Sequence, residues 1–456
     1  RFTATIIGGI NMKAEHSRAL AAAGLLILVG YSHPGMASGF LNDIQSASSA
    51  SVSTAGQTAI AEDASTVYYN AAGMTLLDRA ELVQAAGLIF PTSRFSNGAT
   101  TDILGNPALG STAIKDQVSL LPSMFAVAPV SDRLRLGLGF FVPFGQAYKY
   151  DEGWVGRYQL QNISLKTVDI DPTIAYRMND VFSVGVGLDV QYAHFVRANA
   201  IDFGSLCYVA APPGACPGLG LFPQGADGRL LATVDNWAVG YNFSWLYHPS
   251  DDTHIGFNYR SAVQHSLSGT ARFDVPPTAG PLTAGGLLFQ NTSARSSITF
   301  PDVIALGMSQ RIGERLTLLF DIDWTLWSHV KQLSLAFGNP LQPPIIQPLR
   351  WHDSAKFAVG VIYRVVDSTD LRAGFSYDQS PIPNEFRSAD LPDSDQIMFS
   401  AGIEYRFNAQ LSATVSYSYG HYMPTRMNLT LPAAGTVAGS FEHSSSAIGL
   451  QGRLQF

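Results

Sequence analysis

Residues 411–419 read LSATVSYSY, and their side chains alternate between two kinds. Leucine, alanine, valine and two tyrosines occupy the odd positions, while serine or threonine occupies every even position. Successive side chains of a β-strand point to opposite faces, so the stretch predicts a strand with one apolar and one polar face. Residues 182–192, 316–324 and 399–407 repeat the pattern, with mostly polar or tiny residues on the second face. Such segments are typical of strands between lipid and a polar lumen.

The composition favours a membrane protein without spanning helices. Only 14% of the 456 residues are charged, whereas soluble domains carry about 25%. Beyond the N-terminal region the chain has no apolar run of about 18 residues, the length that a transmembrane helix needs. A β-barrel is the other structure that satisfies every backbone polar group in lipid. The net charge of −7 is mild and includes no basic stripe, which argues against a nucleic-acid partner.

The connections between the expected strands separate this barrel from a soluble β-sandwich, which also alternates. Short and long connections follow one another along the chain, as periplasmic turns and extracellular loops do in outer-membrane barrels. The tight turns are expected at residues 130–133, 178–181, 248–253, 311–315, 366–369 and 407–409. The long loops are expected near residues 96–118, 145–157, 199–229, 274–292, 336–348, 380–391 and 421–439. We therefore expect an all-β transmembrane antiparallel barrel of about fourteen strands over residues 81–456, in the outer membrane of a Gram-negative cell.

The N-terminal region predicts a signal segment followed by a plug. Residues 19–29 form an apolar run too short to span, and residues 35–37 (GMA) are suited to cleavage, so residues 1–37 are expected to be an upstream extension and signal peptide that is removed. Residues 38–74 consist largely of serine, alanine, threonine and glycine, too few large apolar residues to build a core. We expect residues 38–80 to form a helical hatch that plugs the lumen.

Two cysteines and two uncharged loops mark the extracellular side. Cys207 and Cys216 predict a disulfide in an oxidising compartment, with two free thiols as the alternative. Residues 203–226 and 275–294 contain no charged side chain but carry large apolar ones. They favour either a surface that captures hydrophobic compounds or a cap in which the two loops pack on each other. The residues expected at a capture surface are Leu221, Phe222, Leu287 and Leu288.

No pattern of residues indicates catalysis. The histidines are scattered, and the chain contains neither a nucleophile motif nor a metal-binding spacing. We expect no catalytic residue, no metal and no cofactor.

Several motifs resemble the long-chain fatty-acid transporter (FadL) family of outer-membrane proteins, which also includes aromatic-hydrocarbon uptake proteins. They are GFLN at 39–42, AEDAS at 61–65, NAAGM at 70–74, FVPFG at 141–145, EGWVGRY at 152–158, FPD at 300–302, FSYDQSPIP at 375–383 and LPDSD at 391–395. In the family the third of these usually reads Asn-Pro-Ala-Gly-Met, so Ala71 replaces a proline and leaves the turn less rigid. The matches extend over nearly the whole mature chain.

The resemblance implies a monomeric barrel of fourteen strands that takes up hydrophobic compounds passively. It implies capture by extracellular loops, a ligand site beside the mature N-terminus and lateral release through a kinked third strand. The residues that it places at the ligand are Phe40, Leu41, Asn70, Ala71, Ala72 and Arg157, the last being equally suited to a structural ion pair. Residues 133–145 correspond to the third strand, in which Gly137, Gly139 and Pro143 weaken strand pairing.

The substrate and the partners follow from the same resemblance. Long-chain fatty acids and aromatic or alkane hydrocarbons are both family substrates. The expected partners are the hydrophobic ligand, outer-membrane lipid and lipopolysaccharide, and the barrel-assembly machinery, whose recognition signal the terminal strand with Phe456 resembles. The alternatives are a general porin for polar solutes and, less favoured, a barrel enzyme.

Overall fold

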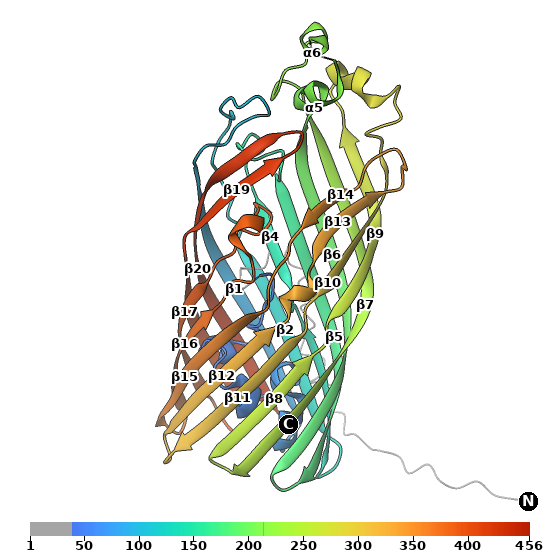
Figure 1. Ribbon diagram of the computed structural model, residues 1–456. Coiled ribbons are helices and arrows are strands. Elements are labelled where there is room, and N and C mark those ends of the chain that lie inside the picture. The colour runs from blue at the N-terminus through green and yellow to red at the C-terminus, as the bar shows by residue number, and fades with distance from the viewer. Residues whose placement is uncertain (1–38, 213) are drawn as a thin grey trace, which may run out of the picture. The chain divides into compact units, whose positions relative to one another are not determined.

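The computed structural model describes residues 39–212 and 214–456. The expected signal segment, residues 1–37, and the expected first mature residue, Ser38, lie outside the described residues. The described strands form one antiparallel barrel, because β1 (Glu81–Asn97) pairs with β2 (Ser119–Pro129) on one side and with β20 (Gly435–Gln455) on the other (Figure 1). The barrel has 14 strands, which confirms the fold expected from the sequence.

Breaks divide some of the 14 barrel strands into two segments, so the sheet consists of 20 strand segments, each with its own label. Besides β1, β2 and β20, they are β3 (Leu134–Phe141), β4 (Gly145–Lys149), β5 (Asn162–Asn179), β6 (Phe182–Asp202), β7 (Asp227–Ser250), β8 (Thr253–Arg260), β9 (Val263–Asp274), β10 (Thr292–Phe300), β11 (Val303–Ile312), β12 (Leu316–Thr325), β13 (Gln332–Phe337), β14 (Ile345–Pro348), β15 (Ser354–Val366), β16 (Thr369–Asp378), β17 (Gln396–Arg406), β18 (Leu411–Tyr422) and β19 (Thr425–Leu431). Segments such as β3 and β4, or β18 and β19, follow each other along one barrel strand.

The alternation of the sequence appears directly in the wall. On β18, Val415 is 52% exposed on the outer face, whereas Ser416 beside it is 2% exposed and faces inward. Tight turns lie at one end of the barrel, and the loops that carry α5 (Phe203–Ala210) and α6 (Ala215–Gly218) lie at the other (Figure 1). The remaining helices outside the hatch are η2 (Pro277–Thr283), η3 (Trp327–His329) and η4 (Asn384–Phe386). None of the helices in the described residues has the length and apolarity to cross a membrane.

The segment before β1 folds into short helices inside the barrel (Figure 1, blue). They are α2 (Ala47–Ala50), α3 (Gln57–Ile60), α4 (Thr66–Tyr69) and η1 (Ala71–Leu76). Their small residues approach glycines of the wall closely: a Cβ on Gly374 would lie 2.1 Å from the Val52 carbonyl, and one on Gly256 would lie 1.8 Å from the Thr58 carbonyl oxygen. The tiny residues on the inner face therefore make room for the hatch backbone.

Buried charges attach the hatch to the wall. Arg372 on β16 donates two hydrogen bonds to the Glu62 carboxylate, at 2.7 and 2.8 Å, and also pairs with Glu404 on β17. Gln451 on β20 donates to Asp63 at 2.7 Å. Because a buried charge is tolerated only when it is paired, these contacts hold the plug in one orientation.

Candidate ligand site and its connections

An aromatic cluster surrounds Phe40, next to the first described residue. The Phe40 ring lies 4.8 Å from Trp327, 5.4 Å from Trp351, 5.6 Å from Phe300 and 6.1 Å from Phe144, measured between ring centroids. Phe40 is 3% exposed and belongs to an apolar core that also contains Trp327 and Trp351. These rings come from four separate segments of the chain, so only the closed barrel brings them together.

Backbone contacts fix the position of this N-terminal segment. The Gly39 N–H donates to Oδ2 of Asp393 at 3.0 Å, and the Phe40 carbonyl accepts from the Gly145 N–H at 2.9 Å. Gly39 has a φ of 64°, and a Cβ there would lie 2.5 Å from the Trp327 ring. Only glycine fits this position, because both the backbone conformation and the space exclude a side chain.

A cavity of about 470 Å³ lies against Phe40. We call it the Phe40 cavity. Most of its wall is apolar and comes from barrel strands and from the loop segments around residues 349 and 386. Its polar lining residues are Gln146, Gln347, Ser388 and Asp390. A concave apolar site with a few polar groups is the usual form of a small-molecule site.

The one ionisable side chain in this lining, Asp390, is already paired. It forms an ion pair with Arg197 on β6, and both side chains are 8% exposed. Asp390 also accepts a hydrogen bond from Ser388 at 3.1 Å, and Arg197 donates to the Gln159 carbonyl at 2.8 Å. The charge at the edge of the cavity is therefore neutralised by contacts within the protein.

The third barrel strand breaks close to this cavity. β3 pairs with β2 from Met124↔Phe140 to Pro129↔Arg135, whereas β4 pairs with β5. In the described residues, Ser119–Ser123 of β2 form no ladder with β3 or β4, so the wall contains an unpaired stretch there. Backbone hydrogen bonds that would otherwise close the wall are redirected inward at the break.

The hatch receives the hydrogen bonds of the break. The Pro143 carbonyl accepts from the Asn42 backbone N–H at 2.7 Å. The Val142 carbonyl accepts from the side-chain amides of Asn42 at 2.8 Å and Gln45 at 2.9 Å. The segment that carries Phe40 is thus also the segment that holds the broken strand.

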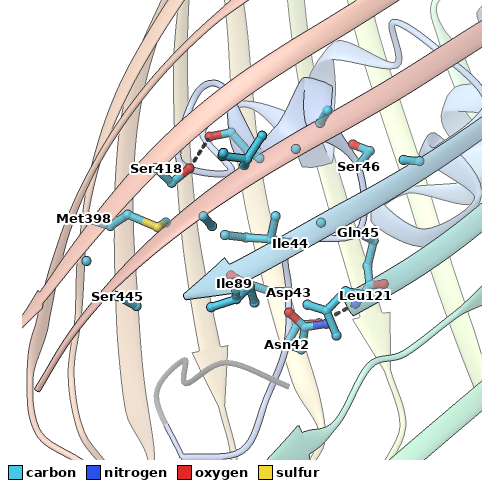
Figure 2. Close-up of a pocket in the computed structure, with 18 of the residues that line it drawn as sticks. Asn42, Asp43, Ile44, Gln45, Ser46, Ile89, Leu121, Met398, Ser418 and Ser445 are labelled. Atoms are coloured by element: carbon cyan, nitrogen blue, oxygen red, sulfur yellow. Dashed lines mark hydrogen bonds between the residues drawn. The ribbon is translucent and has the colours of Figure 1, made fainter. Parts of the chain in front are cut away.

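A larger cavity of about 830 Å³ lies between residues 42–50 and the wall strands β1, β2, β17, β18 and β20. Figure 2 shows Asn42 and Gln45 of the hatch near Ile89 of β1 and Leu121 of β2, which line this wall cavity. Leu121 belongs to the unpaired stretch of β2. A further cavity of about 350 Å³ lies at the extracellular end of the same stretch, against β4.

A more polar cavity of about 690 Å³ lies on the other side of the N-terminal segment, against β8, β11 and β12. Asp43 and Lys356 line both this cavity and the wall cavity, and they form an ion pair with each other. In the described part of the chain, no group of three His, Cys, Asp or Glu side chains could hold a metal ion.

The structure places the residues expected at the ligand in different environments. Phe40 lines the Phe40 cavity, and Leu41 lines the polar cavity. Asn70 and Ala72 lie deep in the hatch, where Asn70 donates to the Thr58 and Trp245 carbonyls at 2.6 and 3.0 Å. Ala71 is also buried there, against Gly185 of β6.

Arg157 has its donors occupied in the extracellular loops. Its Nε–H donates to Asp227 at 2.7 Å, Nη1 donates to the Leu109 carbonyl at 2.9 Å and Nη2 donates to the Tyr158 hydroxyl at 2.7 Å. Of its two expected roles, this geometry is that of the structural ion pair.

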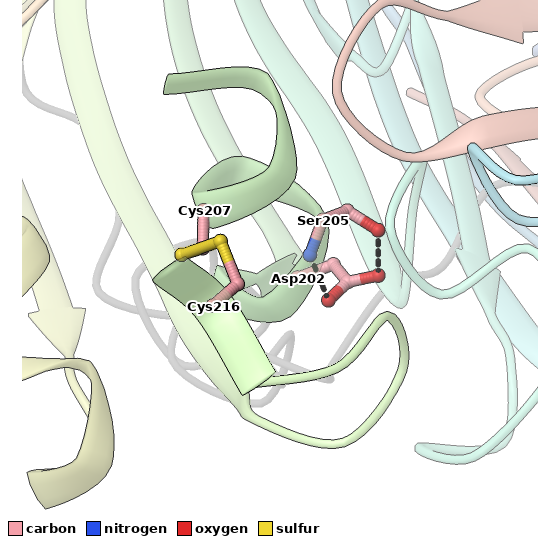
Figure 3. The surroundings of a disulfide bond; sticks show 4 residues. All are labelled: Asp202, Ser205, Cys207 and Cys216. Carbon is pink, nitrogen blue, oxygen red and sulfur yellow. Dashed lines mark hydrogen bonds between the residues drawn. A yellow bond between two sulfur atoms is a disulfide. The ribbon is translucent and has the colours of Figure 1, made fainter. Parts of the chain in front are cut away.

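The two uncharged loops show features of both expected arrangements, the cap of mutually packed loops and the exposed apolar surface. Cys207 and Cys216 form a disulfide, and Asp202 accepts hydrogen bonds from the backbone and hydroxyl of Ser205 at the start of α5 (Figure 3). Leu221 is fully buried in the small core beneath the disulfide, and Phe203 packs on Phe289 of the other loop at 4.9 Å. The loops therefore pack on each other, with part of their apolar surface left outside. Phe222 is 51% and Leu287 57% exposed, and Leu288 is half-buried.

Of the three residues expected to weaken the third strand, Pro143 lies at the break, whereas the two glycines do not. Gly137 and Gly139 lie within the paired part of β3 and face the hatch: a Cβ on Gly137 would lie 2.4 Å from Met74 Sδ, and one on Gly139 would lie 3.2 Å from Val67. Their lack of a side chain makes room for the hatch. The break lies at Pro143 and its two neighbours, between β3 and β4.

Sequence reasoning did not single out Gln146, Trp327 or Trp351 for the ligand site. The motif at 141–145 ends one residue before Gln146, which is the only signal that pointed to that residue. Neither tryptophan stands in a recognisable motif, and their contact with Phe40 depends on strands distant in the sequence.

The plugged barrel defines the class of the protein: an outer-membrane barrel whose lumen is closed by its own N-terminal segment. Residues 28–456 match the family model described as outer membrane protein transport protein (OMPP1/FadL/TodX), and the chain belongs to this family. It is therefore a multi-pass β-barrel of the Gram-negative outer membrane, from a family of transporters of hydrophobic compounds.

Relatives and solved structures agree with this assignment. The chain is 28% identical over 445 residues to a putative outer membrane protein of Neisseria meningitidis, covering 92% of this chain and 95% of the relative. It is 26% identical over 403 residues to a long-chain fatty acid transport protein of Escherichia coli, covering 86% and 88%. A FadL homologue of Pseudomonas aeruginosa superposes with a TM-score of 0.84 at 23% identity, covering 92% of this chain and all (100%) of that chain. The toluene transporter TodX of Pseudomonas putida gives 0.64 at 18% identity, covering 86% and 94%.

Proposed function

We propose that the protein takes up hydrophobic compounds passively and releases them sideways into the outer membrane. The compound is captured at the exposed apolar residues of the loops, passes to the Phe40 cavity and leaves through the break in the third strand. The observation that carries this proposal is the Phe40 cavity, a mostly apolar space of about 470 Å³ next to the N-terminal end of the hatch.

The proposed route, from the loops through the Phe40 cavity to the break, keeps a hydrophobic compound out of water. Burying apolar surface gains about 25 cal/mol per Å², so a compound held among apolar side chains does not return readily to the aqueous phase. Phe222 and Leu287 offer the first apolar contacts outside the barrel. The wall cavity and the unpaired stretch of β2 offer the last ones before lipid.

The N-terminal segment connects binding to release. A compound in the Phe40 cavity contacts Phe40, and two residues further on Asn42 holds the Pro143 carbonyl. Displacement of Phe40 by a bound compound shifts Asn42 and frees the carbonyls of the break. The break in the wall then opens, because the backbone from Phe40 to Asn42 both contacts the bound compound and holds the broken strand.

The partners follow from the same route. The protein is proposed to work as a monomer whose sheet is closed by the β1–β20 pairing. Outer-membrane lipid and lipopolysaccharide surround the apolar outer face and receive the compound, and the barrel-assembly machinery inserts the chain.

Filling the Phe40 cavity tests this function. Leu333→Trp introduces a large ring into the cavity from β13, and Ile346→Trp introduces the same ring at a 57% exposed position on the neighbouring β14. We expect Leu333→Trp to lower both binding and uptake of neutral aromatic compounds by a strain that lacks its own transporter, while Ile346→Trp leaves them unchanged. Normal uptake through a folded Leu333→Trp barrel would contradict the route.

Conductance in planar lipid bilayers separates this function from a general porin. We expect the intact protein to pass little steady ion current, because the hatch occupies the lumen. Large steady currents would favour a porin for polar solutes.

A further inference from the structure

Gln146 has an amide without a partner at the Phe40 cavity. The residue lies on β4, is 6% exposed and lines the cavity. Its Oε1 is buried without a hydrogen bond, and its amide makes none to any other described residue. Buried polar groups in native proteins are nearly always hydrogen-bonded, so this orphaned amide oxygen in a cavity wall leaves a hydrogen bond for a water molecule or a ligand to supply.

Trp351 presents a second orphan at the same cavity. Its ring is 6% exposed and lies 5.4 Å from Phe40, and its Nε1–H has no acceptor among the described residues. The indole can only donate, whereas an amide offers a donor and an acceptor. A hydroxyl group is the smallest neutral group that accepts from one such partner while it donates to another.

The cavity is poorly suited to a carboxylate. Asp390 is the only ionisable residue among its lining residues, and it carries the same sign as a carboxylate. Arg197 beside the cavity is already bound to Asp390 and to the Gln159 carbonyl. Arg350, which stacks over the Phe386 ring, does not line the cavity. An ionised carboxylate buried here would meet no unpaired cation in the lining, which is strongly unfavourable.

We propose that the compound held in the Phe40 cavity is a neutral hydrophobic molecule with one hydroxyl group, an alkylphenol. The hydroxyl binds the Gln146 amide and the Trp351 indole N–H, and the ring packs among the aromatic side chains of Phe40, Phe195 and Phe386, which share the lining. The proposal rests on the proposed function, because it requires that the cavity be the ligand site.

Three compounds of similar size test the proposal on the purified full-length protein in detergent. They are 4-butylphenol, butylbenzene and 4-butylbenzoate, with binding followed by tryptophan fluorescence at pH 7.5. A phenol is neutral at this pH, since its pKa is about 10. We expect 4-butylphenol to bind about tenfold more tightly than butylbenzene, as one or two satisfied hydrogen bonds allow, and 4-butylbenzoate to bind most weakly.

Two glutamines of the same cavity supply the matched variants. Gln146→Leu is expected to remove the advantage of 4-butylphenol over butylbenzene. Gln347→Leu is the control, because the Gln347 amide already donates to Ser388 at 3.0 Å, and it is expected to keep the advantage. Trp351→Phe should reduce the advantage in part, and heat-modifiability on gels confirms that each barrel is folded.

The outcomes distinguish a failure of the hydroxyl assignment from a failure of the proposed function. Equal binding of the three compounds, tighter binding of 4-butylbenzoate, or an undiminished phenol advantage in Gln146→Leu would overturn the hydroxyl assignment and leave the Phe40 cavity as the ligand site. Failure of all three compounds to bind, or binding that Leu333→Trp does not weaken, would overturn the ligand site and with it both proposals.

Discussion

The carbonyl oxygen of Pro143 accepts a hydrogen bond from the backbone N–H of Asn42 at 2.7 Å. Pro143 lies in the break of the third barrel strand, and Asn42 lies in the hatch two residues after Phe40. The Pro143 carbonyl in the wall is thus hydrogen-bonded to the hatch and not to the neighbouring strand. Because buried carbonyls need a partner, removing the plug from this position leaves the wall with unpaired groups.

Gln45→Leu should loosen the break. The Gln45 amide donates to the Val142 carbonyl at 2.9 Å and to the Asn42 carbonyl at 2.5 Å. Losing a donor to a buried acceptor costs about 1–3 kcal/mol, so we expect faster amide hydrogen exchange at residue 142 and residues 144–146. Gln57→Leu is the control, since Gln57 is also buried in the hatch but its Nε2 has no partner. Unchanged exchange in Gln45→Leu would contradict this role.

Gly137→Val should destabilise the whole barrel and not merely slow transport. The new Cβ would lie 2.3 Å from Thr173 Oγ1 and 2.4 Å from Met74 Sδ, so hatch or wall must move. Overpacking of this kind typically costs about 1–3 kcal/mol. We expect a lower unfolding temperature by heat-modifiability on gels. Gly452→Val, on β20 with nothing within 4 Å of its Cβ, should be nearly neutral; a stable Gly137→Val barrel with impaired uptake would instead support a wall-sealing effect.

Arg372→Met should release the hatch from β16. The substitution leaves the buried Glu404 and the partly buried Glu62 without the cation that lies between them, and breaking a buried ion pair costs about 3–5 kcal/mol. We expect protease cleavage within residues 39–80 and increased ion conductance, while the barrel remains inserted. Arg311→Met, which removes an ion pair with Asp252 at an exposed turn, should change neither property. A protease-resistant, electrically silent Arg372→Met protein would refute this prediction.

The stability of the folded protein should fall as the pH rises towards 7, because the Asp393 carboxyl is buried. Burial raises the pKa of Asp393, in the loop before β17, from 3.8 to about 7. The folded protein therefore binds this proton more tightly than the unfolded chain, and the resulting stabilisation is present below pH 4 and is lost as the pH rises through 7. We expect a higher unfolding temperature at pH 5 than at pH 8. Asp393→Asn keeps an acceptor for the Gly39 N–H and should flatten this dependence; an equally steep dependence in that variant would assign it to another group.

Local patterns were enough to predict the architecture. Alternation in residues 411–419 and in similar stretches predicted lipid-facing strands, and the sorting of short and long connections predicted their number. The small residues of 38–74 predicted a plug. Each of these properties is encoded by neighbours in the sequence, because strand periodicity, turn length and the lack of large apolar residues are local.

The candidate site could not be predicted to the same extent. Phe40 was expected near the ligand through its motif, whereas Trp351 and Gln146 were not expected there at all. Arg157 was open between two roles, and its three occupied donors are seen only when the loops are folded. Gly137 was interpreted through strand pairing alone, since the sequence does not reveal that Met74 occupies the space beside it.

The sequence by itself determined that the chain forms a plugged outer-membrane barrel, because a period of two and a composition poor in charge leave few other structures in lipid. The tertiary structure alone decided where the wall is unpaired, which charges neutralise each other and which polar groups at the Phe40 cavity lack a partner. These properties depend on contacts such as Asn42 with Pro143 and Arg197 with Asp390, which are separated by about 100 and 193 positions in the chain. Closure of the barrel brings such residues together, and no local pattern encodes that proximity.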